Sequence, residues 1–179
     1  MAAVAAASFR TEPLDSKRHD RAGFTCGVEA LDRYLKTQAA QDMRRKANAV
    51  FVMVPKEQPS RIVGYFTLGA LAIDQGQVPE AARTHVPRYP LVSATLIGRL
   101  AIAKERQRQG LGAMLLALAL GKAYRNADVV GSSMVVVDAI DEPAARFYQA
   151  HGFIRLPESM RLILPMRVVS RLVGPQGRD

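Results

Sequence analysis

Two glycines and a cluster of basic residues lie where a buried strand gives way to an apolar helix. Gly110 and Gly112 open the predicted helix. The basic residues just before them are Lys104, Arg106 and Arg108. The first turn of a helix carries N–H groups without intrahelical acceptors, and the helix dipole adds positive potential there. Glycine also lets the backbone approach a ligand closely. The junction therefore predicts a site for an anion such as a pyrophosphate.

The glycine spacing distinguishes this junction from two other phosphate-binding loops. No Gly-Lys-Ser/Thr follows, and Leu115 stands where the dinucleotide fingerprint needs its third glycine. The run Gln107-x-x-Gly110-x-Gly112 instead resembles the Gln/Arg-x-x-Gly-x-Gly/Ala signature of GNAT acetyltransferases, which use acetyl-CoA. The resemblance implies that the cofactor is bound by the backbone amides of Leu100, Ala101, Ile102, Gln107, Arg108, Gln109, Gly110, Leu111, Gly112 and Ala113.

A second stretch further along the chain resembles the same family. Ala144-Ala-Arg-Phe-Tyr-Gln-Ala-His-Gly-Phe153 is similar to the GNAT segment in which a helix carries Phe-Tyr and ends at Gly-Phe. The resemblance implies that Tyr148 protonates the departing CoA thiolate. A phenol with an ordinary pKa near 10 is protonated at neutral pH and can act as a general acid. Taken by itself, Tyr148 also suits a packing role.

One subgroup of the family is more similar than the rest: the GNAT toxins of bacterial toxin–antitoxin pairs, which acetylate aminoacyl-tRNA and block translation. The matching segments are His19, Phe24-Thr-Cys-Gly27, Leu31-Asp-Arg-Tyr-Leu35, Val63–Leu68, Gly98–Ala103 and Asp138–Tyr148. Ala103 departs from the pattern, because the toxins usually carry Asp there. This resemblance implies charged tRNA as substrate, a ribbon-helix-helix antitoxin as partner, a possible homodimer and a location in the bacterial cytoplasm.

The carboxylates of the sequence favour an acceptor that needs little help to lose a proton. A lysine side chain has a pKa near 10.4, whereas an α-amino group titrates near 7.7–8.0. Many GNATs carry a Glu base on the fourth strand, but between Asp74 and Glu105 this sequence has only Glu80, in a predicted loop. Asp138 and Asp141 are the other candidate bases, but we interpret them as strand-end and helix-capping residues. A GNAT acting on a small-molecule amine or a protein N-terminus is the alternative.

The net charge is strongly positive. Lys and Arg number 25 against 16 Asp and Glu, a net charge of +9, which attracts polyanions such as nucleic acid. We expect phosphate contacts with a tRNA acceptor stem from Lys36, Arg44, Arg45, Lys46, Arg88 and Arg99. Each of these side chains could equally be an ordinary solvated charge. A catalytically inactive regulator that binds nucleic acid is a further alternative, against which the intact glycines and Tyr148 argue.

The elements that position these residues alternate between strands and helices. Strands are expected over 9–14, 49–54, 61–74, 94–103, 132–138, 153–156 and 161–166, and helices over 28–46 (one or two), 110–126 and 142–151. Strand 94–103, its helix and strand 132–138 form a βαβ unit with parallel strands. The predicted fold is the α/β GNAT fold: a mixed, mostly antiparallel sheet with one splayed parallel pair and helices on both faces.

Length and composition limit the remaining possibilities. A chain of 179 residues fits a single domain, 1–179, with flexible tails expected at about 1–8 and 168–179. The one cysteine, Cys26, excludes an intramolecular disulfide and is interpreted as a packing residue. The three histidines lack metal-ligand spacing, so no metal is expected. No apolar run reaches the roughly 18 residues of a membrane span.

Overall fold

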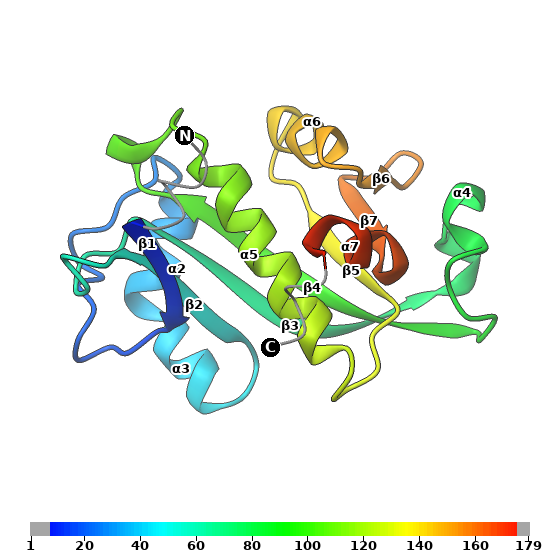
Figure 1. The fold of residues 1–179 in the computed structure, drawn as a ribbon, viewed down its shortest axis with the longest axis horizontal. Coiled ribbons are helices and arrows are strands. Elements are labelled where there is room, and N and C mark those ends of the chain that lie inside the picture. Colours follow the sequence, from blue (N-terminus) through cyan, green and yellow to red (C-terminus); the bar gives the residue numbers. More distant parts are fainter. Residues whose placement is uncertain (1–7, 175–179) are drawn as a thin grey trace. The chain divides into compact units, whose positions relative to one another are not determined.

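The computed structural model describes residues 8–174. Its strands are β1 (Phe9–Pro13), β2 (Ala49–Pro55), β3 (Gly64–Asp74), β4 (Leu91–Ile102), β5 (Met134–Asp138), β6 (Ile154–Arg155) and β7 (Arg161–Pro165). Its helices are α2 (Glu29–Thr37), α3 (Ala39–Arg44), η1 (Gln75–Gln77), α4 (Glu80–Arg83), η2 (Lys104–Arg106), α5 (Leu111–Asn126), α6 (Glu142–Ala150) and α7 (Met166–Val173). Figure 1 shows them along the chain.

The sheet has the strand order β1-β2-β3-β4-β5-β7-β6. The pairs β1–β2, β2–β3, β5–β7 and β6–β7 are antiparallel. The pair β4–β5 is parallel, with a register that runs from Ala94↔Met134 to Ile97↔Val137. The predicted mixed, mostly antiparallel sheet with one parallel pair is confirmed.

Two compact units divide the chain. The first comprises the residues up to Leu68 together with Arg99–Leu118, and the second comprises Gly69–Gly98 and the residues from Ala119 onward. β3, β4 and α5 run through both units. The single domain expected from the chain length stays a prediction.

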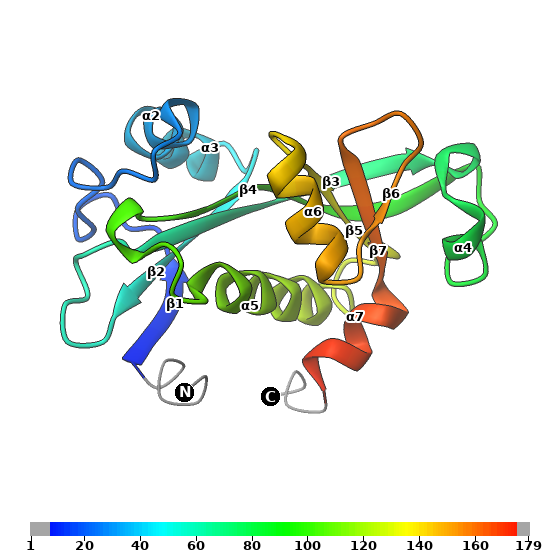
Figure 2. The ribbon, with the colours of Figure 1, turned by 90° about the horizontal axis from the view of Figure 1, so that it is seen from above.

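Alternation along β2 builds the core of the first unit. Val50, Val52 and Val54 are buried with Leu35 of α2, whereas the intervening Phe51 points to the opposite side of the strand because side chains alternate along a strand. In this unit α2 and α3 cover one face of the strands and the first half of α5 covers the other (Figure 2).

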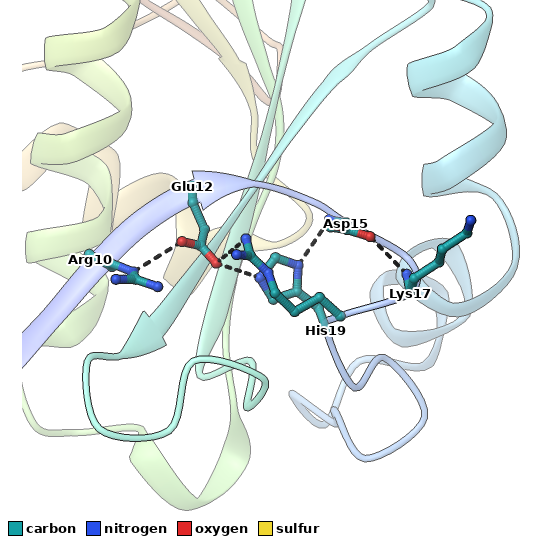
Figure 3. A network of polar contacts seen from close by, with 6 residues as sticks. Arg10, Glu12, Asp15, Lys17 and His19 are labelled. Carbon is teal, nitrogen blue, oxygen red and sulfur yellow. Dashed lines mark hydrogen bonds and ion pairs between the residues drawn. The ribbon is translucent and has the colours of Figure 1, made fainter.

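The segment after β1 is fixed by the carboxylate of Glu12. This carboxylate accepts hydrogen bonds from His19 Nε2 at 2.7 Å and from Arg18 at 2.8 Å, and it pairs with Arg10 at 3.0 Å (Figure 3). The backbone N–H of Asp15 donates to His19 Nδ1 at 2.9 Å, which sets the Nε2–H tautomer. Burial alone would raise the pKa of Glu12, but these partners hold that pKa below its ordinary value.

The core of the second unit lies on the face of β5 that carries Met134 and Val136. These two side chains are buried together with Ile163 of β7 and with Val78 and Ala82 from the connection between β3 and β4. This connection contains the short helices η1 and α4. Apolar residues on the connection thus hold it against the sheet.

The C-terminal segment differs from the expectation. Residues 168–173 were assigned to a flexible tail, but they belong to α7, in which Met166 and Val169 are buried and which contacts β5 and β7. Met166 and Val169 are three residues apart, so they share one helix face, while the arginines between and after them give the segment its polar composition. The remaining tail residues, 1–7 and 175–179, lie outside the described residues.

Candidate active site

The turn between β4 and α5 places two residues in the left-handed backbone region. Arg108 has a φ of 62° and Gly110 a φ of 78°. That region costs a residue with a Cβ about 1–2 kcal/mol, and such strain is typical of ligand-binding turns. A Cβ added at Gly110 would meet no heavy atom within 4 Å. The backbone angle, and not lack of space, is therefore the reason for glycine at this position.

This turn and the first turn of α5 present a row of free backbone amides. Within residues 8–174, the N–H groups of residues 108–113 donate no hydrogen bond to the protein, and the first α5 bond runs from Met114 N to Gly110 O at 3.3 Å. Six consecutive free donors at a helix N-terminus are suited to bind an anion. The amides from Arg108 to Ala113 that the sequence predicts for the pyrophosphate are thus available.

Gln107 has a different position from the other predicted cofactor residues. Its side-chain Nε2 donates to Cys26 O at 2.8 Å and to Ile102 O at 3.0 Å. Its backbone N–H already points to Lys104 O at 3.4 Å. The signature glutamine thus holds the turn in shape through its side chain.

The other predicted cofactor residues, Leu100, Ala101 and Ile102, lie on β4 beyond the last pair of its ladder with β5, Ile97↔Val137. Parallel strands that stop pairing leave backbone groups for other partners. This position on β4 agrees with the pantetheine contacts that the sequence predicts.

The N-terminal motif supports the same turn. The carboxylate of Asp32 accepts hydrogen bonds from Thr25 Oγ1 at 2.9 Å and from Cys26 N at 2.8 Å. The carbonyls of these two residues then accept from the turn: Thr25 O from Lys104 N at 2.8 Å, and Cys26 O from Gln107. The motif segments at 24–27 and 31–35 therefore fix the turn between β4 and α5 in the first unit.

The thiol of Cys26 is buried, and burial together with the nearby Asp32 carboxylate raises its pKa to about 11. A thiol with this pKa is protonated at neutral pH and is a poor nucleophile. This agrees with the interpretation of Cys26 as a packing residue.

Tyr148 lies on α6 in the second unit and is 8% exposed. Its ring packs edge-on against Phe147 at 5.2 Å and Phe153 at 5.4 Å between centroids. Burial raises the pKa of its phenol to about 12. Within residues 8–174 its hydroxyl makes no hydrogen bond. The group is therefore a protonated donor whose hydrogen is free for another acceptor.

The two carboxylates near the end of β5 are engaged in structural contacts. Asp138 accepts two hydrogen bonds from Arg161, at 2.7 and 2.9 Å. Asp141 caps α6, with its side chain accepting from Ala144 N at 2.8 Å. The interpretation of Asp141 as a capping residue is confirmed, and Asp138 is held in a bidentate ion pair, so neither carboxylate is free to serve as a base.

Beside this ion pair the second unit contains an open cavity of about 800 Å³. Its walls come from η1 and α4, from Asp138 and from the turn between β6 and β7. Val78, Leu156 and Met160 give it apolar surface, while Arg161 and other charged side chains line the rest. The cavity can accept a group of mixed polarity.

The predicted RNA-contacting residues divide between the two units. The cations on α2, on α3 and in the turn after it are exposed and make no ion pair within residues 8–174; they are Lys36, Arg44, Arg45 and Lys46. Arg88 is exposed in the second unit. Arg99 is half-buried on β4 in the first unit.

Arg99 has a partner that the sequence does not predict for the site. Its guanidinium carbon lies 3.5 Å from the centroid of the Tyr34 ring. The only sequence signal for Tyr34 is its place in the motif at 31–35, next to the buried Leu35.

Among residues 8–174, no group of three or more His, Cys, Asp or Glu side chains is arranged to hold a metal ion. His19 uses both ring nitrogens within the protein, and His151 Nδ1 lies 2.8 Å from Phe147 O. No helix within this range is long and apolar enough to cross a membrane.

Comparison with known proteins gives concordant matches. Residues 48–155 match the model of the acetyltransferase (GNAT) domain. The tRNA-acetylating toxin of Mycobacterium tuberculosis is 29% identical over 160 residues, which cover 89% of this chain and 93% of the toxin.

Two solved structures extend the likeness to the fold. The toxin AtaT complexed with acetyl-methionyl-tRNAfMet has a TM-score of 0.83 at 28% identity, over 93% of this chain and 99% of that chain. A tyrosine-to-phenylalanine mutant of AtaT bound to acetyl-CoA and the C-terminus of the antitoxin AtaR has a TM-score of 0.78 at 26% identity, over 92% and 98% of the two chains.

Proposed function

The chain belongs to the GNAT acetyltransferase family, and we propose that it is a toxin-type member that acetylates the α-amino group of aminoacyl-tRNA and so blocks translation in the bacterial cytoplasm. The observation that carries this proposal is the likeness to AtaT holding acetyl-methionyl-tRNAfMet, which extends over 93% of this chain. The relative from Mycobacterium tuberculosis, itself a tRNA-acetylating toxin, supports the same substrate class.

The cofactor assignment rests on the turn before α5. The free amides of residues 108–113 fit the pyrophosphate of acetyl-CoA, because each can donate to a phosphate oxygen without losing a partner in the protein. Leu100, Ala101 and Ile102 are proposed to hold the pantetheine and to polarise the thioester carbonyl through backbone N–H groups. Gln107 acts here by holding the turn.

The proposed reaction is a direct transfer. The neutral amine attacks the thioester carbonyl carbon, the new C–N bond forms, the C–S bond breaks, and the amine gives its surplus proton to solvent. Tyr148 donates its phenolic proton to the leaving thiolate and regains a proton from solvent. Its protonated hydroxyl makes no hydrogen bond within residues 8–174 and is available for this step. An α-amino group titrates near 7.7–8.0, so a large fraction is neutral at physiological pH without a protein base.

The exposed cations are proposed to bind the RNA. Lys36, Arg44, Arg45 and Lys46 present exposed positive charge on α2, α3 and the following turn, which suits the phosphates of an acceptor stem. Arg88 and Arg99 are proposed to add two further contacts. An antitoxin is the expected protein partner, since AtaT has been solved with the C-terminus of AtaR. The ribbon-helix-helix class of that antitoxin and a homodimeric state are proposed from the family resemblance.

Acetyl transfer from labelled acetyl-CoA tests the function. The acceptors are a mixed pool of charged tRNA, the same tRNA uncharged, polyamines, and peptides with free N-termini. Label on charged tRNA alone, released together with the amino acid on mild ester hydrolysis, is the expected result. Label on peptides or polyamines but not on charged tRNA would contradict the toxin assignment and leave a GNAT with another acceptor.

A further inference from the structure

Arg99 and Tyr34 form a contact that joins two parts of the first unit, β4 and α2. The Arg99 guanidinium carbon lies 3.5 Å from the centroid of the Tyr34 ring, the distance of a face-on cation–π contact. Tyr34 is 5% exposed and Arg99 is half-buried. A contact of this kind restricts a long side chain that would otherwise sample many rotamers.

The guanidinium keeps its hydrogen-bond donors free. Within residues 8–174 no carboxylate oxygen lies within 4.0 Å of the Arg99 side-chain nitrogens, and the side chain donates no hydrogen bond. The carboxylate of Asp42, on the adjoining α3, is engaged by Tyr34 Oη at 2.8 Å and by Asn48 Nδ2 at 3.0 Å. Hydrogen bonds from Asn48 and Tyr34, and then the nearby charge of Arg99, lower the pKa of Asp42. Arg99 makes no ion pair with this carboxylate within residues 8–174, so its guanidinium donors are available to an external anion.

The Tyr34 ring is itself fixed from two sides. Its hydroxyl donates to Asp42, and its ring lies nearly parallel to the Tyr65 ring, at 14° and 6.5 Å between centroids. The Tyr65 hydroxyl in turn donates to Leu31 O at 2.7 Å. Burial and the Asp42 carboxylate raise the pKa of Tyr34 to about 12, so its phenol stays neutral. The aromatic face under Arg99 therefore has one orientation.

The face of β4 on which Arg99 lies favours RNA over the cofactor as the source of the anion. Ala101 and Ala103, which share the strand parity of Arg99, are buried with Tyr34 in the core beneath α2 and α3. The exposed cations Lys36, Arg44, Arg45 and Lys46 belong to those same helices and the turn after them. The free amides that suit the cofactor pyrophosphate begin α5, which covers the opposite face (Figure 2).

Resting on the proposed function, we propose that Tyr34 is a positioning residue that holds the Arg99 guanidinium ready to bind a phosphate near the 3′ end of the charged tRNA. Arg99 directly precedes Leu100–Ile102, the proposed thioester-binding residues of β4. A phosphate bound at Arg99 is therefore anchored next to the segment where acetyl transfer is proposed, and it sets the register of the terminal nucleotide that carries the amino acid.

The test measures KM for charged tRNA, KM for acetyl-CoA and kcat in four single variants and in the double variant that combines Arg99→Gln with Tyr34→Leu. Arg99→Gln removes the charge, Tyr34→Leu removes the aromatic face, and Tyr34→Phe keeps the ring but loses the bond to Asp42. Arg33→Gln removes a neighbouring charge on α2 whose nearest partner is Glu29 at 3.9 Å, and it serves as the matched control. Thermal unfolding of each variant reports whether it folds.

The expected result is a rise of about tenfold in KM for charged tRNA in Arg99→Gln and Tyr34→Leu, with KM for acetyl-CoA changed less than about twofold. Arg99→Gln should also lower the slope of log KM against log salt by about one phosphate contact. The double variant should be little worse than either single one, because the two residues act as a unit. Tyr34→Phe keeps the aromatic ring, so it should retain most of the affinity for charged tRNA that Tyr34→Leu loses. Arg33→Gln should resemble wild type.

Three outcomes would overturn the proposal. A rise in KM for acetyl-CoA instead would assign the bound phosphate to the cofactor. An unchanged KM for charged tRNA in Arg99→Gln would show that Arg99 binds no phosphate, and this result stands even if Tyr34→Leu fails to fold. If Arg33→Gln raised KM for charged tRNA as much as Arg99→Gln, the effect would be the general attraction of positive charge for RNA and not a phosphate site at Arg99. A wild-type protein that acetylates no charged tRNA refutes the proposed function as well, whereas an active wild type with unaffected variants refutes this inference alone.

Discussion

Replacing Tyr148 with Phe removes the proposed general acid and little else. The ring of Tyr148 packs against Phe147 and Phe153, so truncation to Ala would leave a cavity costing about 3–5 kcal/mol. Phe keeps that packing. Since the hydroxyl makes no hydrogen bond within residues 8–174, its loss leaves no unpaired group behind. We expect the free energy of unfolding to change by less than about 1 kcal/mol.

The kinetic effect should be large, because the phenol is fully protonated where the enzyme works. With a pKa raised by burial to about 12, the deprotonated fraction at pH 8 is on the order of one in ten thousand. Loss of a positioned general acid lowers the rate by about 10²–10⁴-fold, equivalent to about 3–5 kcal/mol of activation free energy. This loss should fall on kcat, with KM for both substrates nearly unchanged.

The assay follows CoA thiol release and labelled acetyl transfer to charged tRNA under saturating acetyl-CoA, for the wild type and for Tyr148→Phe. Circular dichroism and thermal unfolding confirm that the variant is folded. A folded Tyr148→Phe protein whose kcat stays within about threefold of wild type would refute the assignment of Tyr148 as the acid. It would leave thiolate protonation to water.

Three further expectations follow from the site. Gly110→Ala should raise the Kd for acetyl-CoA about tenfold, because the φ of 78° at this position strains a residue with a Cβ. Gly131→Ala is the control and should leave the Kd unchanged, because a Cβ added there also meets no heavy atom within 4 Å and its φ is not positive. Calorimetric titration checks both variants. The pH profile of kcat/KM can be measured with a hydrolysis-resistant, amide-linked aminoacyl nucleoside as acceptor. The value of kcat/KM should rise as the amine deprotonates and then stay flat to about pH 10, because burial raises the pKa of Tyr148 to about 12. A fall in kcat/KM near pH 9 would contradict this. Cys26→Ala should keep kcat within about twofold, and iodoacetamide should label wild-type Cys26 slowly at pH 8, since its pKa is raised to about 11; a Cys26→Ala protein that folds but loses activity would indicate a covalent step.

The strands and the two long helices were predictable because their signals are local. The apolar runs in β2 and β5 are read directly from neighbouring residues, and Asp141 with Pro143 marks the start of α6. α7 was missed because its arginines obscure an apolar stripe that is meaningful only once β5 and β7 provide a surface for it.

The roles of individual side chains were less accessible than the elements that carry them. Gln107 belongs to a recognisable signature, but the sequence does not show that its side chain reaches Cys26 O, 81 positions away. Likewise Asp138 reads as a strand-end residue, and only the antiparallel register of β5 with β7 places Arg161 opposite it. Pairings of this kind depend on how distant segments are brought together.

The sequence by itself predicted the anion-binding turn before α5, since a helix N-terminus and a left-handed glycine are properties of a few consecutive residues such as Gly110. It also marked Tyr148 as the candidate acid. Tertiary structure alone decided that Tyr148 is buried between Phe147 and Phe153, and that Arg99 lies over Tyr34 without an ion pair within residues 8–174. The physical reason is that burial and side-chain stacking are set by packing between segments far apart in the chain, on which local pattern carries no information.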